Sequence, residues 1–363
     1  MTKNNQDKSV DSSANHKLAV LLMLVFVLMI AYFGTRSYSL IQRDDSLGEE
    51  ASGSQVDTAP DQEPTKPEET SLRPKVGTTL YVPAESTARN QINQWQDDPA
   101  RNSDIALLNI LANTPTAIWL SGPDADAPTR LQGHIEAALS TNTMPVFVLY
   151  NIPQLGCGEG GATSLAAYNS WIDDIVTHTT LLDEYIIIVE PDAVPMISCL
   201  SETNMQARID AISHAADVFL NDGAYVYVDA GHSSWVSEQD IAKTLKQIPR
   251  IDEVGFSLNI SNFQADDDLI AFGNSLSNLL GGNTPFVIDS SRNGLGPDPQ
   301  NEWCNPFGRS VGKQSKIVDE GNLEAYLWIK VPGESDAACN GGPTEGHWWA
   351  EYALDLVRNS NEF

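Results

Sequence analysis

The most restrictive feature of the chain is the stretch Tyr185–Asp192, in which an apolar run ends in two acidic residues separated by a proline. Such a run, rich in β-branched residues, is typical of a strand covered on both faces, as in a parallel sheet. Because proline cannot donate to the strand ladder, the strand is predicted to stop near Glu190 and to leave Asp192 just beyond its C-terminal end. In α/β barrels that end forms the catalytic rim. The alternative is that both acids are solvated loop residues.

Further apolar runs recur along the chain, at residues 117–121, 145–151, 224–229, 254–259, 285–289 and 325–330. Helix-like segments lie between them, at residues 128–140, 164–177, 204–221 and 237–247. This alternation predicts an α/β fold. We expect a distorted, seven-stranded TIM-like barrel of parallel strands with its active site at the C-terminal face. An open sheet agrees less well with the sequence, because polar or aromatic residues suited to function stand at the ends of six of the seven strands. An open sheet usually binds its ligand at one switch point only.

The N-terminal part has a different composition from the rest. Residues 18–33 form an unbroken apolar run that follows a polar stretch with three lysines. We interpret 1–17 as a cytoplasmic segment, 18–36 as a signal anchor or signal peptide, 37–75 as a disordered acidic linker and 76–363 as the catalytic domain. An uncleaved anchor is favoured because no clear small-x-small cleavage site follows the run. The expected location is extracytoplasmic, either membrane-anchored by this segment or secreted after its cleavage.

The net charge of −28 excludes nucleic acid as an expected partner and favours neutral or cationic ligands. The six histidines lack metal-ligand spacing and no thiol cluster is present, so we predict no catalytic metal and no cofactor. The four cysteines, none in a close pair, fit two disulfides if the domain lies outside the cytoplasm. We expect a monomer.

Two chemistries compete at the end of the 224–229 strand. Ser233 lies between a strand and a helix, as in the nucleophile elbow of an esterase, but Trp235 occupies the position where that motif needs glycine. Alternatively, Asp229 is a second carboxylate beside Asp192, and His232 and Trp235 shape a binding subsite. Paired acids can separate their pKa values so that one stays protonated as a general acid. His232 can also be an ordinary hydrogen-bonded loop histidine.

Other candidates follow the remaining strands. Trp119 and Tyr150 lie at the ends of the first two strands, where aromatic rings can stack on sugars, although core packing is the alternative. Beyond the last strand stand Lys330, Glu334 and Asp336, which form either a binding site or an exposed loop.

Taken together, six ordered motifs within residues 78–358 resemble glycoside hydrolase family 6, the inverting cellulases. They are Tyr150-Asn-Ile-Pro153, Glu190-Pro-Asp192, Asp229-Ala-Gly-His232, Phe286-Val-Ile-Asp-Ser-Ser-Arg-Asn-Gly294, Trp303-Cys-Asn-Pro306 and Leu327-Trp-Ile-Lys-Val-Pro-Gly-Glu-Ser-Asp336. The resemblance implies a cleft or tunnel that cuts β-1,4-glucan. It implies Asp192 as general acid, Asp336 as proposed base, Asp229 as a supporting carboxylate and Tyr150 pressing on the sugar at the cleavage point. It further implies that neighbouring subsites are lined by Trp119, His232, Trp235, Asn262, Trp303, Lys330 and Glu334, and that the disulfides are Cys157–Cys199 and Cys304–Cys339.

The chain departs from the family at one motif. The family usually reads Asn-Ile-Pro-x-Arg-Asp-Cys, whereas this chain has Leu155 and Gly156 in place of the arginine and aspartate. The missing carboxylate would help to keep the general acid protonated, and Glu159 is one residue that could replace it. We therefore carry three hypotheses: an exported, endo-acting β-1,4-glucanase, a catalytically weakened glucan-binding relative, and an esterase that uses Ser233.

Overall fold

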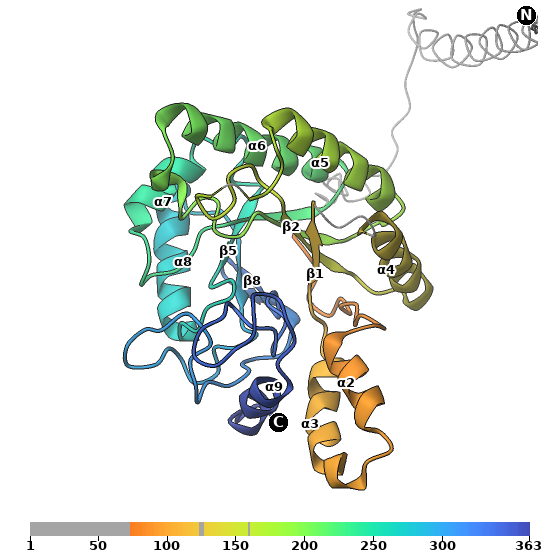
Figure 1. Cartoon of the computed structure of the whole chain (residues 1–363). Coiled ribbons are helices and arrows are strands. Elements are labelled where there is room, and N and C mark those ends of the chain that lie inside the picture. The colour runs from red at the N-terminus through yellow and green to blue at the C-terminus, as the bar shows by residue number, and fades with distance from the viewer. Residues whose placement is uncertain (1–72, 123–126, 159) are drawn as a thin grey trace, which may run out of the picture. The chain divides into compact units, whose positions relative to one another are not determined.

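A curled, mostly parallel sheet forms the centre of the molecule (Figure 1). The computed structural model describes residues 73–122, 127–158 and 160–363. The sheet order is β1-β2-β3-β4-β5-β6-β8-β7. The strands are β1 (Ile118–Ser121), β2 (Val146–Tyr150), β3 (Ile186–Val189), β4 (Tyr225–Asp229), β5 (Gly255–Leu258), β6 (Phe286–Asp289), β7 (Lys316–Glu320) and β8 (Leu323–Leu327). The predicted α/β barrel class is confirmed, and all seven predicted strands are present.

The strand count differs from the prediction by one. The additional strand, β7, pairs with β8 in the antiparallel direction at the edge of the sheet. Its sequence, Lys-Ile-Val-Asp-Glu, is largely exposed, so the search for long apolar runs missed it. At the other edge of the sheet, an isolated bridge joins Thr116, which precedes β1, to Trp328, which follows β8. The result is a distorted barrel rather than a continuous one.

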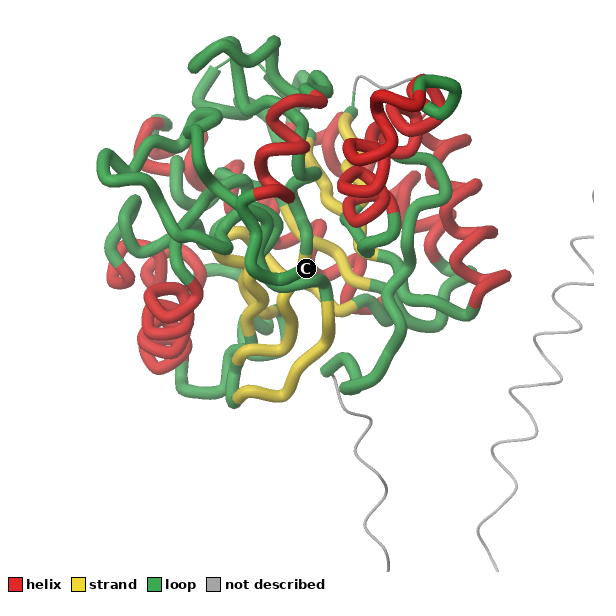
Figure 2. Tube along the Cα trace, turned by 90° about the horizontal axis from the view of Figure 1, so that it is seen from below, coloured by secondary structure: helices red, strands yellow, loops and turns green. Residues whose placement is uncertain are grey.

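Helices surround the sheet on the outside (Figures 1 and 2). They are α4 (Ala127–Thr141), α5 (Leu165–Thr179), α6 (Glu202–Asn221), α7 (Glu238–Leu245) and α8 (Asp266–Leu280). Three of them begin at a serine whose hydroxyl accepts a hydrogen bond from a backbone N–H of the first turn: Ser164 before α5, Ser201 before α6 and Ser237 before α7. Such caps stabilise a helix by about 1 kcal/mol each and explain where these helices start.

A second group of helices packs beside the barrel. It consists of α2 (Thr87–Trp95), α3 (Asn102–Ala112) and α9 (Ala350–Arg358). A 3₁₀ turn at Pro99–Arg101 joins α2 to α3, and another lies after β3 at Ile197–Cys199. Figure 1 shows α3 and α9 near each other, and Arg358 bonds Asp104 at 2.6 Å between them. Buried Trp328 and Val311 complete their apolar core. This group fixes the chain that follows β8, which carries part of the site.

The N-terminal predictions fall outside the described residues. Segments 1–17 and 18–36 and all but the last residues of 37–75 belong to this part of the chain. Within the described residues, no helix has the length and apolar character needed to cross a membrane.

Both predicted disulfides are present. Cys157 is bonded to Cys199 and Cys304 to Cys339, and no described cysteine is free. The first bond links the loop after β2 to the chain after β3, and the second links two loops beyond β6 and β8. Each therefore ties together segments that leave the C-terminal ends of different strands.

Reduction of the disulfides should lower the melting temperature. The bonds span 42 and 35 residues, and loop-closure entropy at these lengths gives about 4 kcal/mol for each. Thermal unfolding with and without a reductant measures the effect. In the double variant Cys304→Ser/Cys339→Ser only one disulfide remains. A reductant should therefore lower its melting temperature less than that of the wild type. Four free thiols in exported protein, counted by mass spectrometry, would contradict the pairing.

Candidate active site

The C-terminal ends of the strands open into a cleft of about 790 Å³. Because the strands from β1 to β6 and β8 are parallel, the residues that follow them meet at this one edge. All the predicted site residues except Asp229 and the cysteines line the cleft: Trp119, Tyr150, Asp192, His232, Trp235, Asn262, Trp303, Lys330, Glu334 and Asp336. The structure thus brings together groups that are more than 200 residues apart in the sequence.

The turn after β3 separates the two acidic residues. Glu190 and Asp192 both adopt left-handed backbone conformations, with φ of 50° and 72°. Such conformations are costly for residues other than glycine and concentrate at functional sites. Asp192 lies at the cleft, whereas Glu190 is fully buried and accepts hydrogen bonds from the N–H groups of Asn151 and Ile152, each at 2.9 Å. The reading of both acids as solvated loop residues is therefore wrong, and Glu190 connects the ends of β2 and β3.

Asp192 and Asp229 are neighbouring acids joined by a backbone-to-side-chain hydrogen bond. The backbone N–H of Asp192 donates to Oδ2 of Asp229 at 2.7 Å, and Asp229 is buried behind it. Burial, followed by the charge of the neighbouring Asp192, raises the pKa of Asp229 to about 7. Burial, followed by the charge of Glu345, raises the pKa of Asp192 to about 6. A carboxyl with a pKa in this range can hold a proton at mildly acidic pH and act as a general acid.

Asp336 lies in a different environment. Its Oδ2 accepts from the guanidinium of Arg292 at 2.9 Å and from the backbone N–H of Asn305 at 3.0 Å, and its Oδ1 lies 3.9 Å from Nζ of Lys330. Arg292 is fully buried, and its guanidinium also lies over the ring of Phe263. The carboxylate of Asp336 is thus fixed between two cations at the edge of the cleft.

Buried Asp289 holds the base of this region together. Its two carboxylate oxygens accept from the backbone N–H groups of four residues that follow β5, β6 and β8: Ser261, Ser291, Ile329 and Lys330. Burial raises its pKa. Asp289 therefore positions the strand ends that carry Arg292 and Lys330.

Aromatic rings line the cleft. Trp303 and Trp235 are 57% and 40% exposed, which leaves their faces open to a ligand. The rings of Trp119 and Tyr150 contact edge to face, with centroids 5.2 Å apart, and Nε1 of Trp119 donates to the carbonyl of Ile329. Exposed aromatic side chains that remain in a rigid cleft are suited to stacking on sugar rings.

The polar residues of the cleft are strongly affected by burial. Burial lowers the pKa of His232 to about 4, so its imidazole is neutral at neutral pH. Burial also lowers the pKa of Lys330 and raises the pKa of Glu334 to about 7. Groups of this kind bind a neutral, hydroxyl-rich ligand through hydrogen bonds rather than through net charge.

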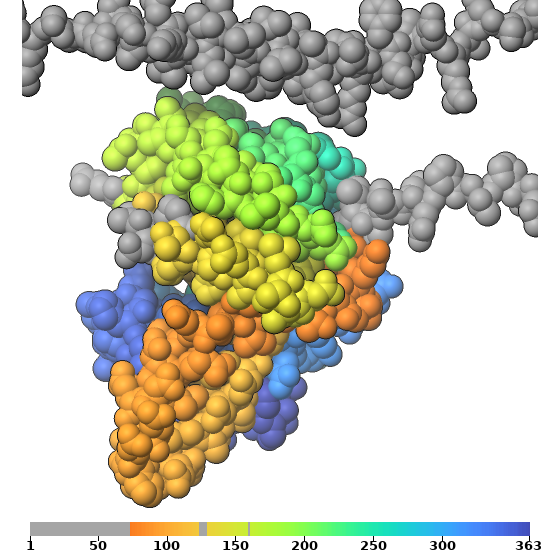
Figure 3. Space-filling model, turned by 90° about the vertical axis from the view of Figure 1, so that its right-hand side faces the viewer, coloured from red at the N-terminus to blue at the C-terminus, as the bar shows by residue number. Residues whose placement is uncertain are grey.

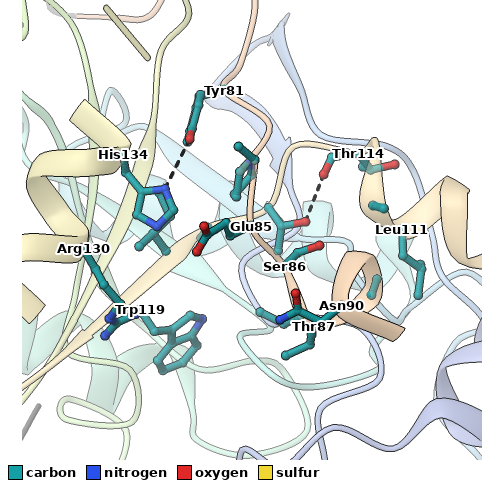
Figure 4. A pocket seen from close by; sticks show the side chains of 18 of the residues that line it. Tyr81, Glu85, Ser86, Thr87, Asn90, Leu111, Thr114, Trp119, Arg130 and His134 are labelled. Carbon is teal, nitrogen blue, oxygen red and sulfur yellow. Dashed lines mark hydrogen bonds between the residues drawn. The ribbon is translucent and has the colours of Figure 1, made fainter. Parts of the chain in front are cut away.

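A second hollow of about 630 Å³ adjoins the cleft and shares Trp119 and Glu334 with it. Figure 4 shows Tyr81 and His134 joined by a hydrogen bond of 3.3 Å on one side of this hollow. Chain segments from the start of α2 and from α4 line it, and these segments lie side by side on the face seen in Figure 3. The ligand-accessible surface therefore extends beyond Trp119.

Two predicted features are not part of the cleft. Ser233 is exposed and does not line it, although its neighbours His232 and Ser234 do. The geometry therefore gives no support to an esterase. The residues around Gly156 do not line it either, and Glu159 lies outside the described residues.

Sequence reasoning missed several residues of the site, among them Arg292, Asn305 and Glu345. Arg292 and Asn305 stand inside motifs that the sequence analysis quoted, at Phe286–Gly294 and Trp303–Pro306, and that context was the available signal. Glu345 lines the cleft from a loop near the C-terminus. No periodicity or motif marks it.

Comparison with known proteins identifies the family to which the chain belongs. Residues 75–360 match the sequence model of glycosyl hydrolases family 6, so the chain belongs to that family. Endoglucanase A of Cellulomonas fimi is 40% identical over 271 residues, which cover 73% of this chain and 58% of that protein. Endoglucanase 1 of Streptomyces halstedii is 33% identical over 291 residues, covering 77% of this chain and 88% of that protein.

A solved structure agrees with the sequence comparisons. The endoglucanase Cel6 from Mycobacterium tuberculosis, in complex with methyl-cellobiosyl-4-deoxy-4-thio-β-D-cellobioside, superposes with a TM-score of 0.71 at 38% identity. The match covers 78% of this chain and 97% of that one. These relatives are endoglucanases, and a further relative from Aspergillus fumigatus is named a probable 1,4-β-D-glucan cellobiohydrolase. These names give no support to a protein that only binds glucan.

Proposed function

We propose that the protein is an endo-acting β-1,4-glucanase that hydrolyses internal bonds of cellulose or a related β-glucan with inversion at the anomeric carbon. The observation that carries the proposal is the pairing of Asp192 with buried Asp229 in a cleft that also exposes Trp235 and Trp303. The relatives named as endoglucanases support the substrate class, as does the cellobiose-derived ligand of the M. tuberculosis enzyme.

In the proposed reaction, Asp192 is the general acid. Protonated Asp192 gives its proton to the glycosidic oxygen as the bond from that oxygen to the anomeric carbon breaks, and the leaving sugar keeps the bonding electrons. Water adds to the opposite face of the anomeric carbon and loses a proton to a base. Asp336 is the proposed base. Asp229 positions Asp192 through the bond from the Asp192 N–H.

The remaining cleft residues hold the sugar chain in this proposal. Tyr150 presses on the ring at the cleavage point. The neighbouring subsites are formed by Trp119, His232, Trp235, Asn262, Trp303, Lys330 and Glu334. Because burial raises the pKa of Tyr150 far above its usual range, its hydroxyl stays protonated and can donate a hydrogen bond to the sugar.

The test incubates the purified protein with carboxymethyl cellulose and, separately, with a simple ester. We expect reducing ends from the glucan, a rapid fall in viscosity and no acid release from the ester. Proton NMR of early products from a short cello-oligosaccharide should show the α-anomer, which is the inverted configuration. Release of acid without reducing ends would overturn the proposal in favour of an esterase. A slow fall in viscosity relative to the release of reducing ends would argue against endo action.

The exposed tryptophans should contribute mainly to binding. Trp303→Ala and Trp235→Ala are each expected to raise KM for a long cello-oligosaccharide about 2- to 12-fold, since one aromatic contact is worth about 0.5–1.5 kcal/mol. Phe307→Ala is the matched control, because Phe307 is 63% exposed but does not line the cleft. An equal change of KM in the control would show that the effect does not come from stacking in the cleft.

We also propose that the enzyme acts outside the cytoplasm, with residues 18–36 as its membrane anchor or cleaved signal. The two disulfides support an oxidising compartment. Fractionation of expressing cells, followed by N-terminal sequencing of the exported protein, separates the anchored form from the cleaved one. Exclusively cytoplasmic protein would reject the proposal.

A further inference from the structure

A short loop near the C-terminus brings a carboxyl group to the cleft that no motif predicted. Glu345 lines the cleft together with Asp192 and Tyr150. It follows Asp336 by nine residues in the sequence. It approaches the cleft from the loop that follows β8, whereas Asp192 approaches from the turn that follows β3.

The loop that carries Glu345 is firmly attached beside Asp336. The N–H of Gly346 donates to the carbonyl of Ser335 at 2.9 Å, and the N–H of Ser335 donates to the carbonyl of His347 at 3.0 Å. The hydroxyl of Ser335 donates to the carbonyl of Pro343 at 2.8 Å. Gly346 has a φ of 74°, and this left-handed conformation allows the tight turn directly after Glu345. Glu345 therefore has a defined backbone position even though its side chain is solvent-accessible.

The described part of the loop after β2 brings no carboxyl group to the cleft. Gly156 stands where the family usually has an aspartate near the general acid, and neither it nor its described neighbours in residues 154–158 line the cleft. We propose that Glu345 is a positioning residue that takes over this function and keeps Asp192 protonated for catalysis. The proposal rests on the glucanase function proposed above, in which Asp192 is the general acid.

The charges around Asp192 support this assignment. Burial is the main cause of the raised pKa of Asp192, and the charge of Glu345 raises it as well. Asp229 is the other acid coupled to Asp192, since the charge of Asp192 raises the pKa of Asp229. The other titratable groups around Asp192 are Tyr150 and Asp229, the last residues of β2 and β4, His232 after β4, and Lys330, Glu334 and Asp336 after β8. Glu190, from the same turn as Asp192, is buried away from the cleft.

The other acids are already committed to local partners. Asp336 is bonded to Arg292, and Glu190 to two backbone N–H groups. Asp229 accepts from the Asp192 N–H, and Glu334 is offset by Lys330. The negative charge of Glu345 disfavours ionisation of Asp192 and therefore raises its pKa.

The test measures the pKa of Asp192 directly and does not depend on activity. The protein is labelled with ¹³C at the aspartate carboxyl carbons, and the Asp192 signal is assigned by its loss in Asp192→Asn. We expect Glu345→Gln to lower the pKa of Asp192 by about 0.5–1 unit. The change is smaller than for two buried like charges, because solvent screens the exposed Glu345. Glu345→Asp keeps the charge and should keep most of the wild-type pKa. Glu362→Gln, which removes an exposed charge at the C-terminus, is the matched control and should cause no shift.

The same variants are then assayed on an unactivated glucan. The basic limb of the kcat profile should move to lower pH in Glu345→Gln by the amount seen in the titration, which lowers kcat about 3- to 10-fold above pH 7. A cellobioside with a good leaving group needs little protonation and should respond less.

Three results would overturn the proposal: an unchanged Asp192 pKa in Glu345→Gln, an equal shift in Glu345→Asp, or a shift that only Glu159→Gln produces. If the wild-type protein had no activity on glucan, the proposed glucanase function would be wrong. The titration would still decide whether Glu345 raises the pKa of Asp192.

Discussion

The Asp192→Asn variant is expected to hydrolyse unactivated β-glucan about 10²–10⁴-fold more slowly than the wild type, the range that general acid catalysis supplies. An amide of the same shape keeps the contacts of the cleft but has no acidic proton to give to the leaving oxygen. Binding of cello-oligosaccharides, measured by calorimetry, should stay nearly unchanged, because the stacking tryptophans remain. The loss should therefore appear in kcat and not in KM.

The pH profile of the wild type provides a second observation on the same group. Burial and Glu345 raise the pKa of Asp192 to about 6, and a general acid works only in its protonated form. Activity on unactivated glucan should therefore fall as the pH rises through about 6. In Asp192→Asn this limb should disappear, and a substrate with a good leaving group should recover much of the lost rate.

An exposed aspartate on the outside of the barrel provides the control. Asp267 lies in the first turn of α8, away from the cleft, so Asp267→Asn should leave both the rate and the pH profile unchanged. Wild-type turnover by Asp192→Asn on unactivated glucan would show that another group supplies the proton.

The sequence was sufficient to predict the barrel and most of the cleft. The run before Glu190 had to be a buried strand, and Pro191 had to end it, because a proline has no N–H for the ladder. Once the strands are parallel, every residue that follows one of them lies at the same edge. This is why Asp192, His232 and Lys330 meet in one cleft although local sequence does not connect them.

What the sequence did not reveal depends on contacts between distant loops. The left-handed backbone at Glu190 and Asp192 turns one acid into the core and leaves the other at the cleft, and residue identity does not report that rotation. Strand β7 is too polar and exposed to be recognised by an apolar run. Glu345 reaches the cleft from a loop that Ser335 holds through three hydrogen bonds.

A large effect on stability is also expected from the single substitution Arg292→Met. Arg292 is fully buried and bonds Asp336 at 2.9 Å, so its removal leaves the Asp336 carboxylate in the interior without its main partner. Breaking a buried ion pair from one side costs about 3–5 kcal/mol. Urea unfolding should show this decrease in the free energy of unfolding. Arg250→Met is the control, since Arg250 pairs with Glu253 at 2.7 Å on the surface and should cost no more than about 1 kcal/mol.

A double variant separates the ion pair from simple packing. If the cost arises from the uncompensated charge, then adding Asp336→Asn to Arg292→Met should recover part of the lost stability, because the remaining amide is neutral. Additive losses in the double variant would instead assign the cost to the cavity and to the contact of Arg292 with Phe263. The double variant should remain inactive on glucan in either case if Asp336 is the base. Recovery of stability without recovery of activity would therefore show that the buried arginine serves the carboxylate of Asp336. The fold itself would then not require a cation at this position.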